Sequence, residues 1–343
     1  MVFYPSGKKN ILITGGAGFL GSHLCDELVK NNHLICLDNL SGGNVRNIDH
    51  LLAQPNFRFI KHDINEPFNL ENFPELGRFK IKVQGIQEIY HLACPTSAKN
   101  FEKNKIEILK ANSIGTLNLL EMAKQYKAKF LFGSSSVVYG PRPVDKKPFE
   151  ENNFGWVNFI GPRSCFDEGK RFAEAACVTY QQVFGLEIKI ARIFRTYGPR
   201  MPLFDKQMIA DFVLQAINNR PLFIYGDQNF SSSLCYVSDI IEGLVLFMSS
   251  PETGPMNFGS PDDYKLLEVA KKIIELTGSK SEIIFKPATV FISELGLPEI
   301  SLAKEKLGWL PLIKLDKGLE KTINDIKANR LLLQPLVEQY DQE

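Results

Sequence analysis

A glycine-rich turn between an apolar strand and a helix, within the first 28 residues, constrains the fold most. Residues 11–13 form the apolar strand, and leucines at helical spacing from Leu20 onward indicate the helix. Gly15 permits a tight turn, Gly18 permits close approach of a phosphate, and Gly21 permits close packing of helix on strand. Because the free amide groups at the start of a helix bind anions, the segment predicts a phosphate-binding turn.

An acidic residue stands where the ribose of a dinucleotide needs one. Asp38 directly follows the second apolar strand, residues 34–37. Its carboxylate can accept hydrogen bonds from both hydroxyls of an adenosine ribose, which favours NAD over NADP. The glycine turn and this acid together predict NAD as the cofactor.

The net charge, the lengths of the apolar runs and the cysteine spacing exclude several classes of partner and site. The 343 residues carry 40 Lys and Arg against 39 Asp and Glu, so charge predicts neither nucleic acid nor an acidic membrane as a partner. The apolar runs are too short to span a membrane, and the polar start of the chain predicts no signal peptide. The six cysteines form no CxxC pair, which favours reduced thiols, no metal site and a cytoplasmic location.

Strands alternate with helices through the first half of the chain, as in a Rossmann-type, doubly wound parallel sheet of the α/β class. We expect an NAD-binding domain over residues 1–195, to which residues 235–250 return. A smaller C-terminal lobe over residues 196–330 would bind the substrate, and residues 331–343 would form a tail. Two long helices are expected over residues 106–126 and 166–184.

Further motifs run through residues 8–320, among them HLACP at 91–95, GPRSCFDEGKRFAE at 161–174 and RTYGPRM at 195–201. With these motifs the chain resembles the extended short-chain dehydrogenase/reductases, the NAD-dependent epimerase/dehydratase family. Among them it is most similar to the UDP-glucuronate decarboxylases, also called UDP-xylose synthases. The resemblance implies that a UDP-sugar is oxidised at C4, loses CO2 and is reduced again by the same cofactor. It also implies a homodimer that pairs through the two long helices.

The resemblance implies a role for each matching residue at the cofactor. The pyrophosphate would contact Gly15, Gly18, Phe19 and Leu20. The adenosine would contact Asp38, Asn39, Asp63 and Ile64. The cofactor channel would be lined by Leu92, Ala93 and Cys94, and the nicotinamide ribose would be held by Lys170. Three other residues are expected to be structural, namely His91, Asn112 and Tyr139.

The chain departs from the family at the residues that move protons. The family has Tyr four residues before the lysine, where the lysine charge lowers the tyrosine pKa, but this chain has Phe166. The family glutamate associated with decarboxylation is replaced by Val137. Ser135 keeps the hydroxyl that bonds the C4 oxygen, and Ser135, Ser136 or a water remains as a relocated base.

The substrate contacts are changed as well. Ser232 and Gln207 stand where the family has basic residues, and Arg195 stands where it has Asn. We expect Arg195 and Arg200 to contact the diphosphate, with Ser232 at the former arginine position. Three functions stay open: an impaired or altered decarboxylase, an epimerase or dehydratase of another nucleotide sugar, and a non-catalytic regulatory or scaffold protein that binds NAD and a nucleotide sugar.

Overall fold

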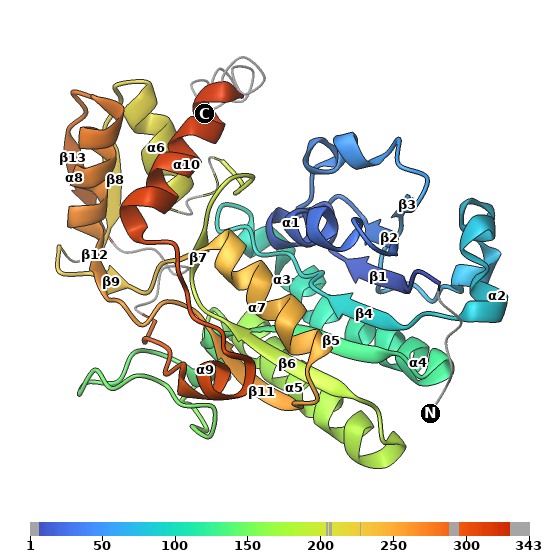
Figure 1. Ribbon diagram of the computed structural model, residues 1–343. Coiled ribbons are helices and arrows are strands. Elements are labelled where there is room, and N and C mark those ends of the chain that lie inside the picture. Colours follow the sequence, from blue (N-terminus) through green and yellow to red (C-terminus); the bar gives the residue numbers. More distant parts are fainter. Residues whose placement is uncertain (1–6, 204, 206–207, 227, 288–294, 330–343) are drawn as a thin grey trace.

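The computed structural model describes residues 7–203, 205, 208–226, 228–287 and 295–329. Its centre is a seven-stranded parallel sheet of order β11-β6-β5-β4-β1-β2-β3 (Figure 1). The strands are β1 (Asn10–Thr14), β2 (His33–Asp38), β3 (Phe57–Lys61), β4 (Glu88–His91), β5 (Lys129–Ser135), β6 (Ile188–Ile193) and β11 (Gly254–Phe258). This order confirms the predicted Rossmann-type α/β class, with its switch point between β1 and β4.

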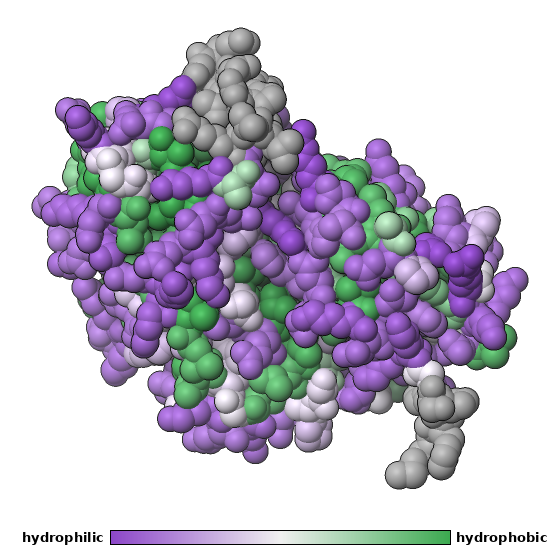
Figure 2. Space-filling view, turned by 45° about the horizontal axis from the view of Figure 1, so that its top comes forward, coloured by the Kyte–Doolittle hydropathy of each residue, from purple (hydrophilic) through white to green (hydrophobic). Residues whose placement is uncertain are grey.

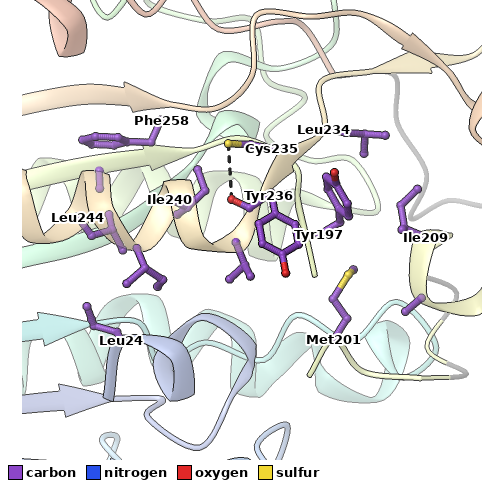
Figure 3. Packing of buried hydrophobic residues seen from close by; sticks show 14 of the residues in the cluster. Leu24, Tyr197, Met201, Ile209, Leu234, Cys235, Tyr236, Ile240, Leu244 and Phe258 are labelled. Carbon is purple, nitrogen blue, oxygen red and sulfur yellow. Dashed lines mark hydrogen bonds between the residues drawn. The ribbon is translucent and has the colours of Figure 1, made fainter. Parts of the chain in front are cut away.

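Helices cover both faces of this sheet, so its strands are apolar on both sides. Ile11 and Ile13 of β1 join one buried cluster and Leu12 joins the other. One face carries α1 (Phe19–Leu28) and α7 (Val237–Ser249). Figure 3 shows α7 between Phe258 of the sheet and Leu24 of α1. The opposite face carries α4 (Thr116–Tyr126) and α5 (Ser164–Phe184).

The expected helix over 106–126 is present with an interruption. Its parts are α3 (Phe101–Lys110), a π-helical turn over Ala111–Gly115, and α4. Nδ2 of Asn112 donates to the Ile108 carbonyl at 2.9 Å inside this turn. This bond confirms a structural role for Asn112, since π-turns form where the regular helical ladder is disturbed.

A smaller lobe holds the remaining elements (Figure 1). Its helices are α6 (Ile209–Ile217), α8 (Leu266–Thr277) and α10 (Leu315–Ala328). Its strands pair as β8 (Leu222–Tyr225) with β13 (Ile283–Lys286), β9 (Ser231–Ser232) with β12 (Tyr264–Lys265), and β7 (Thr196–Tyr197) with β10 (Cys235–Tyr236). Two short helices, α2 (Ile81–Gln84) and α9 (Ser301–Leu307), lie against other parts of the chain.

The chain returns from the lobe to the main sheet through α7 and then β11, so the return extends past the expected residues 235–250. The boundary at residue 195 stays a prediction, and the expected tail over 331–343 lies outside the described residues. Figure 2 shows hydrophilic side chains over most of one face, with apolar residues in separate groups. Within the described ranges, no helix is long and apolar enough to cross a membrane.

His91 at the end of β4 confirms the expected structural histidine. Its Nδ1 lies 2.9 Å from Oγ1 of Thr14, and its Nε2 lies 3.1 Å from Oγ1 of Thr116. The ring is fully buried, and this burial, with the nearby charge of Lys170, lowers the pKa of His91 to about 3.

This depressed pKa predicts a stability loss in acid. The folded-state value lies below the unfolded value of about 6.5, so only the unfolded chain takes up this proton between the two values. The contribution of His91 to the free energy of unfolding is therefore complete above a pH of about 6.5. Below this pH it falls by about 1.4 kcal/mol per pH unit. Urea unfolding between pH 7 and 5 should show that the free energy of unfolding depends less steeply on pH in His91→Gln than in the unmodified chain. An unchanged slope would contradict the assignment, and exposed His50→Gln is the control.

Candidate active site

A cavity of about 850 Å³ lies at the carboxyl ends of the central strands. Gly15 after β1, Leu92 after β4 and Ser135 of β5 form its floor. Met208 and Leu266 reach it from the lobe. Because ligands of doubly wound sheets bind beyond the carboxyl ends at the switch point, this cavity is the candidate site.

The glycine turn has the geometry that the sequence predicts. Gly15 has a φ of +70°, which favours glycine, and its carbonyl accepts from Gly18 N at 3.1 Å. A Cβ added at Gly21 would lie 2.0 Å from that carbonyl oxygen, so helix and turn touch through backbone alone. Since α1 begins at Phe19, its first amide groups are available to an anion in the cavity.

Asp38 at the end of β2 is held for a ligand by two backbone amides. Its carboxylate accepts from Ala17 N at 3.0 Å and from Leu40 N at 2.7 Å. Burial raises the pKa of Asp38, and these two donors oppose the rise. A Cβ at Gly43 would lie 2.7 Å from Oδ2, so space beside the carboxylate depends on a glycine there. A carboxylate that is fixed in this way and lines the cavity fits a ribose diol.

Asn39 lies beside Asp38, and its Nδ2 donates to Oδ2 of Asp63 at 2.9 Å. All predicted cofactor residues line the cavity: Gly15, Gly18, Phe19, Leu20, Asp38, Asn39, Asp63, Ile64, Leu92, Ala93, Cys94 and Lys170. The residues present therefore fit a dinucleotide.

Lys170 of α5 marks the other end of the cavity. Its Nζ donates to the Gly133 carbonyl at 2.8 Å and lies 4.7 Å from the centre of the Phe132 ring. Burial lowers the pKa of Lys170, and the neighbouring Cys94 and Glu174 oppose this shift. Ser135 and Ser136 line the cavity at the same end. The Lys170 ammonium and serine hydroxyls are therefore among the groups that line this part of the cavity.

Val137 and Phe166, which replace the family's polar pair, lie in one apolar cluster. Buried Phe101 and Ile108 of α3 complete the cluster, and Cys94 and Leu295 pack against it. Four of these side chains line the cavity and form what we call the apolar wall: Cys94, Val137, Phe166 and Leu295. Val137 follows Ser135 and Ser136 in the chain, and Phe166 lies on the same helix as Lys170, so these two side chains make this part of the cavity apolar.

Tyr139 does not replace the missing tyrosine. Its ring stacks on Phe149 with centroids 4.6 Å apart, and its hydroxyl donates to Oδ1 of Asn257 at 2.7 Å. Arg192 Nη1 donates to the same hydroxyl at 2.9 Å, and burial raises the pKa of Tyr139 to about 12. The predicted packing role is confirmed, and no tyrosine is among the described residues that line the cavity.

Arg195 brings an excess of positive charge to the cavity. Its half-buried side chain lines the cavity, and its guanidinium makes no hydrogen bond or ion pair with a described residue. Burial and the charge of Arg163 lower its pKa to about 10. Arg163 also lines the cavity but pairs with Asp167 at 3.1 Å. An anionic ligand would relieve the cost of the unpaired charge.

Two predicted substrate residues are not brought to this cavity. Arg200 Nη1 lies 2.8 Å from Oδ2 of Asp26, on the outer side of α1. Ser232 is buried in the β9–β12 pair opposite Tyr264, and its hydroxyl donates to the Ser233 carbonyl at 3.2 Å. Gln207 lies outside the described residues.

Asp205 is a lining residue that the sequence did not single out. Its carboxylate accepts from the Ser97 hydroxyl and from Ala98 N at 3.3 Å. These bonds join the segment before α6 to the loop after β4, and residues of both segments line the cavity. The two segments are far apart in the chain, so no local pattern could indicate the contact.

The chain matches known proteins along most of its length. Residues 11–263 match the model of the NAD dependent epimerase/dehydratase family. UDP-glucuronic acid decarboxylase 1 of Arabidopsis thaliana is 43% identical over 329 residues, which are 95% of this chain and 72% of that protein. The enzyme of the same name from Xenopus tropicalis is 42% identical over 318 residues, 92% of this chain and 72% of that protein.

Solved structures agree with the fold. A Bacillus cereus UDP-glucuronic acid 4-epimerase in complex with UDP-glucuronic acid and NAD has a TM-score of 0.80 and 28% identity, over 93% of this chain and 99% of that one. A Thermotoga maritima UDP-glucose 4-epimerase with UDP-glucose has a TM-score of 0.82 and 28% identity, over 94% and 99%. The family match and the relatives together show that the chain belongs to the NAD dependent epimerase/dehydratase family.

Proposed function

We propose that this chain binds NAD and a UDP-sugar and acts on C4 of the sugar, as a UDP-glucuronate decarboxylase-like enzyme with altered proton transfer. The observation that carries the proposal is one cavity in which the glycine turn, Asp38, Ser135 and Lys170 meet. The decarboxylases that the chain resembles at about 40% identity support the substrate class. When bound, NAD supplies an acceptor and later a donor of hydride.

The residues of the chain bind and orient the two ligands. Asp38 holds the adenosine ribose, and Lys170 holds the nicotinamide ribose at the buried end. The Ser135 hydroxyl donates to the C4 oxygen, and Arg195 binds the diphosphate as a fork of donors. Ser136 or a water takes the C4 proton and passes one of its own on to solvent, because Phe166 has no group that can accept it.

The loss of a tyrosine hydroxyl is compatible with ligand binding in a relative. A Tyr→Phe mutant of the Bacillus cereus UDP-glucuronic acid 4-epimerase was solved with NAD and UDP-4-deoxy-4-fluoro-glucuronic acid. By analogy, we expect this chain to bind both ligands and to react slowly. The apolar wall favours a second candidate, a non-catalytic protein that binds NAD and a nucleotide sugar, since Val137 and Phe166 fill the place of two proton-transfer groups.

Product analysis separates the two candidates. Purified protein is incubated with NAD and UDP-glucuronate and followed by NMR and mass spectrometry. The first candidate predicts slow formation of UDP-xylose or a 4-keto sugar, which Lys170→Met removes. Binding of both ligands without any product would favour the non-catalytic candidate, and failure to bind either ligand would contradict both.

Replacing the unpaired cation at Arg195 is expected to change binding and stability in opposite directions. Arg195→Gln removes a charge-assisted bond of about 1.5–3 kcal/mol, so affinity for UDP should fall about 10- to 100-fold. The ligand-free protein should melt at a higher temperature, because a charge without a described partner is removed from the cavity. Calorimetry and thermal melting measure both effects. Arg200→Gln, outside the cavity, is the control, and equal UDP affinities would contradict the role.

We also propose a homodimer and a cytoplasmic location. Exposed apolar side chains on α3 and α5 support pairing through these helices, namely Ile106, Leu109, Phe172 and Val183. Light scattering that gave the mass of one chain would contradict the dimer.

All six cysteines are free thiols, which supports a reducing compartment. Fractionation of cells with an antibody to the chain would test the location.

A further inference from the structure

Arg163 stands at the start of α5, on the face of that helix which lines the cavity. Its backbone lies in the helical region, and Phe166 and Lys170 follow it at spacings of three and seven residues. Side chains at these spacings share one face of a helix, and all three line the cavity. A guanidinium, an apolar ring and an ammonium therefore follow one another along this side of the cavity.

This row of side chains has a direction relative to the sugar. In the proposed function Lys170 holds the nicotinamide ribose, and Phe166 stands where the family has the base for the C4 hydroxyl. Each helical residue adds about 1.5 Å, so Arg163 lies about 4.5 Å from Phe166 along the helix axis, on the side away from Lys170. A substituent on C5, the sugar carbon next to C4, is therefore within reach of Arg163.

The Arg163 side chain is held in place by an ion pair. Its Nη2 lies 3.1 Å from Oδ1 of Asp167, and the two side chains are 14% and 16% exposed. Burial and then the charge of Arg163 lower the pKa of Arg195 to about 10, so the two guanidiniums repel each other. An anion of the ligand placed beside them would relieve this repulsion.

The other Lys and Arg side chains that line the cavity, within the described part of the chain, are less suited to a carboxylate on C5. Lys170 lies at the nicotinamide end, and Lys99 is exposed to solvent. Arg195 binds the diphosphate in the proposed function. Ser232, which stands where the family has a basic residue, is buried in the β9–β12 pair. Arg163 is the remaining cation at the sugar.

We propose that Arg163 binds the carboxylate on C5 of the sugar and so selects UDP-glucuronate over UDP-sugars that carry an uncharged group there. This inference rests on the proposed function and names the residue that recognises its substrate. Arginine has five N–H donors, so one guanidinium can bind both Asp167 and a second carboxylate. Such a charge-assisted contact is expected to raise affinity about 10- to 100-fold.

Calorimetry with two UDP-sugars tests the proposal on NADH-loaded protein. NADH cannot take a hydride from the sugar, so binding is measured without reaction. UDP-glucose carries a hydroxymethyl group where UDP-glucuronate carries its carboxylate. The unmodified chain should bind UDP-glucuronate about 10- to 100-fold tighter than UDP-glucose. Arg163→Gln should lose most of this preference, whereas Arg195→Gln should weaken the binding of both sugars alike.

A matched variant separates the carboxylate contact from the ion pair. Asp167→Asn removes the same pair but keeps the guanidinium, so the preference for UDP-glucuronate should remain. Arg163→Lys keeps the charge without the fork of donors and should show an intermediate preference. A preference that survives in Arg163→Gln, or that is lost equally in Asp167→Asn, would overturn the role of Arg163 alone. No binding of either UDP-sugar by the unmodified chain would overturn the proposed function as well.

Discussion

Gly21→Ala is expected to weaken NAD binding about 100-fold. The new methyl would lie 2.0 Å from the Gly15 carbonyl oxygen and 2.7 Å from Gly16 Cα. Both neighbours are backbone atoms of the turn itself, so the helix must move away from the phosphate site. Overpacking of this kind costs about 3 kcal/mol, which corresponds to about 100-fold in affinity if the bound form carries the strain.

Calorimetry with NAD measures the loss of affinity, and urea unfolding measures the loss of stability. Gly77→Ala is the matched control, because a Cβ there meets no atom within 4 Å. A Gly21→Ala protein that bound NAD as well as the control would contradict the role of this glycine turn. Loss of fold without a separate loss of affinity would show that the strain acts on the whole domain.

Phe166→Tyr is expected to raise the rate of sugar oxidation about 10²- to 10⁴-fold, the usual contribution of a positioned general base. The ring already lines the cavity, so the added hydroxyl can point to the ligand. Lys170 lies one helical turn further along α5, and its positive charge would lower the pKa of the new phenol. Adding Val137→Glu restores the second family residue and should act on decarboxylation.

Single-turnover kinetics with UDP-glucuronate measure this gain. Phe184→Tyr, the same exchange at an exposed position of α5, is the control and should leave the rate unchanged. A rate that Phe166→Tyr leaves unchanged would show that proton transfer at this position does not limit the reaction. In that case Ser136 would be the next residue to replace.

The sequence predicted the cofactor half of the cavity because that half is built from local patterns. The strand, glycine turn and helix are contiguous, and Asp38 follows its strand directly. The structural roles of His91, Asn112 and Tyr139 were also predicted and are confirmed by their buried hydrogen bonds. His91 ends β4, Asn112 lies in the π-helical turn between α3 and α4, and Tyr139 lies in the short helical turn after β5.

The substrate half was harder to predict because it depends on contacts between distant segments. Arg200 follows a strand end as a phosphate ligand would, but Asp26 of α1 pairs with it away from the cavity. Ser232 lies in the short β9–β12 strand pair, opposite Tyr264. The apolar wall combines Cys94 from the loop after β4, Val137 from the turn after β5, Phe166 of α5 and Leu295, and no local period connects them.

Transfer of deuterium tests the central claim, that NAD and a nucleotide sugar react together in this cavity, most directly. NAD-loaded protein is mixed with UDP-glucuronate deuterated at sugar C4 and quenched with denaturant at a series of times within one turnover, before the deuteride returns to the sugar, and the nicotinamide is analysed by mass spectrometry. Our account predicts transient deuterium in the nicotinamide, which forms slowly with the unmodified chain and faster with Phe166→Tyr. Absence of deuterium from the nicotinamide of both proteins, with both ligands bound, would contradict it.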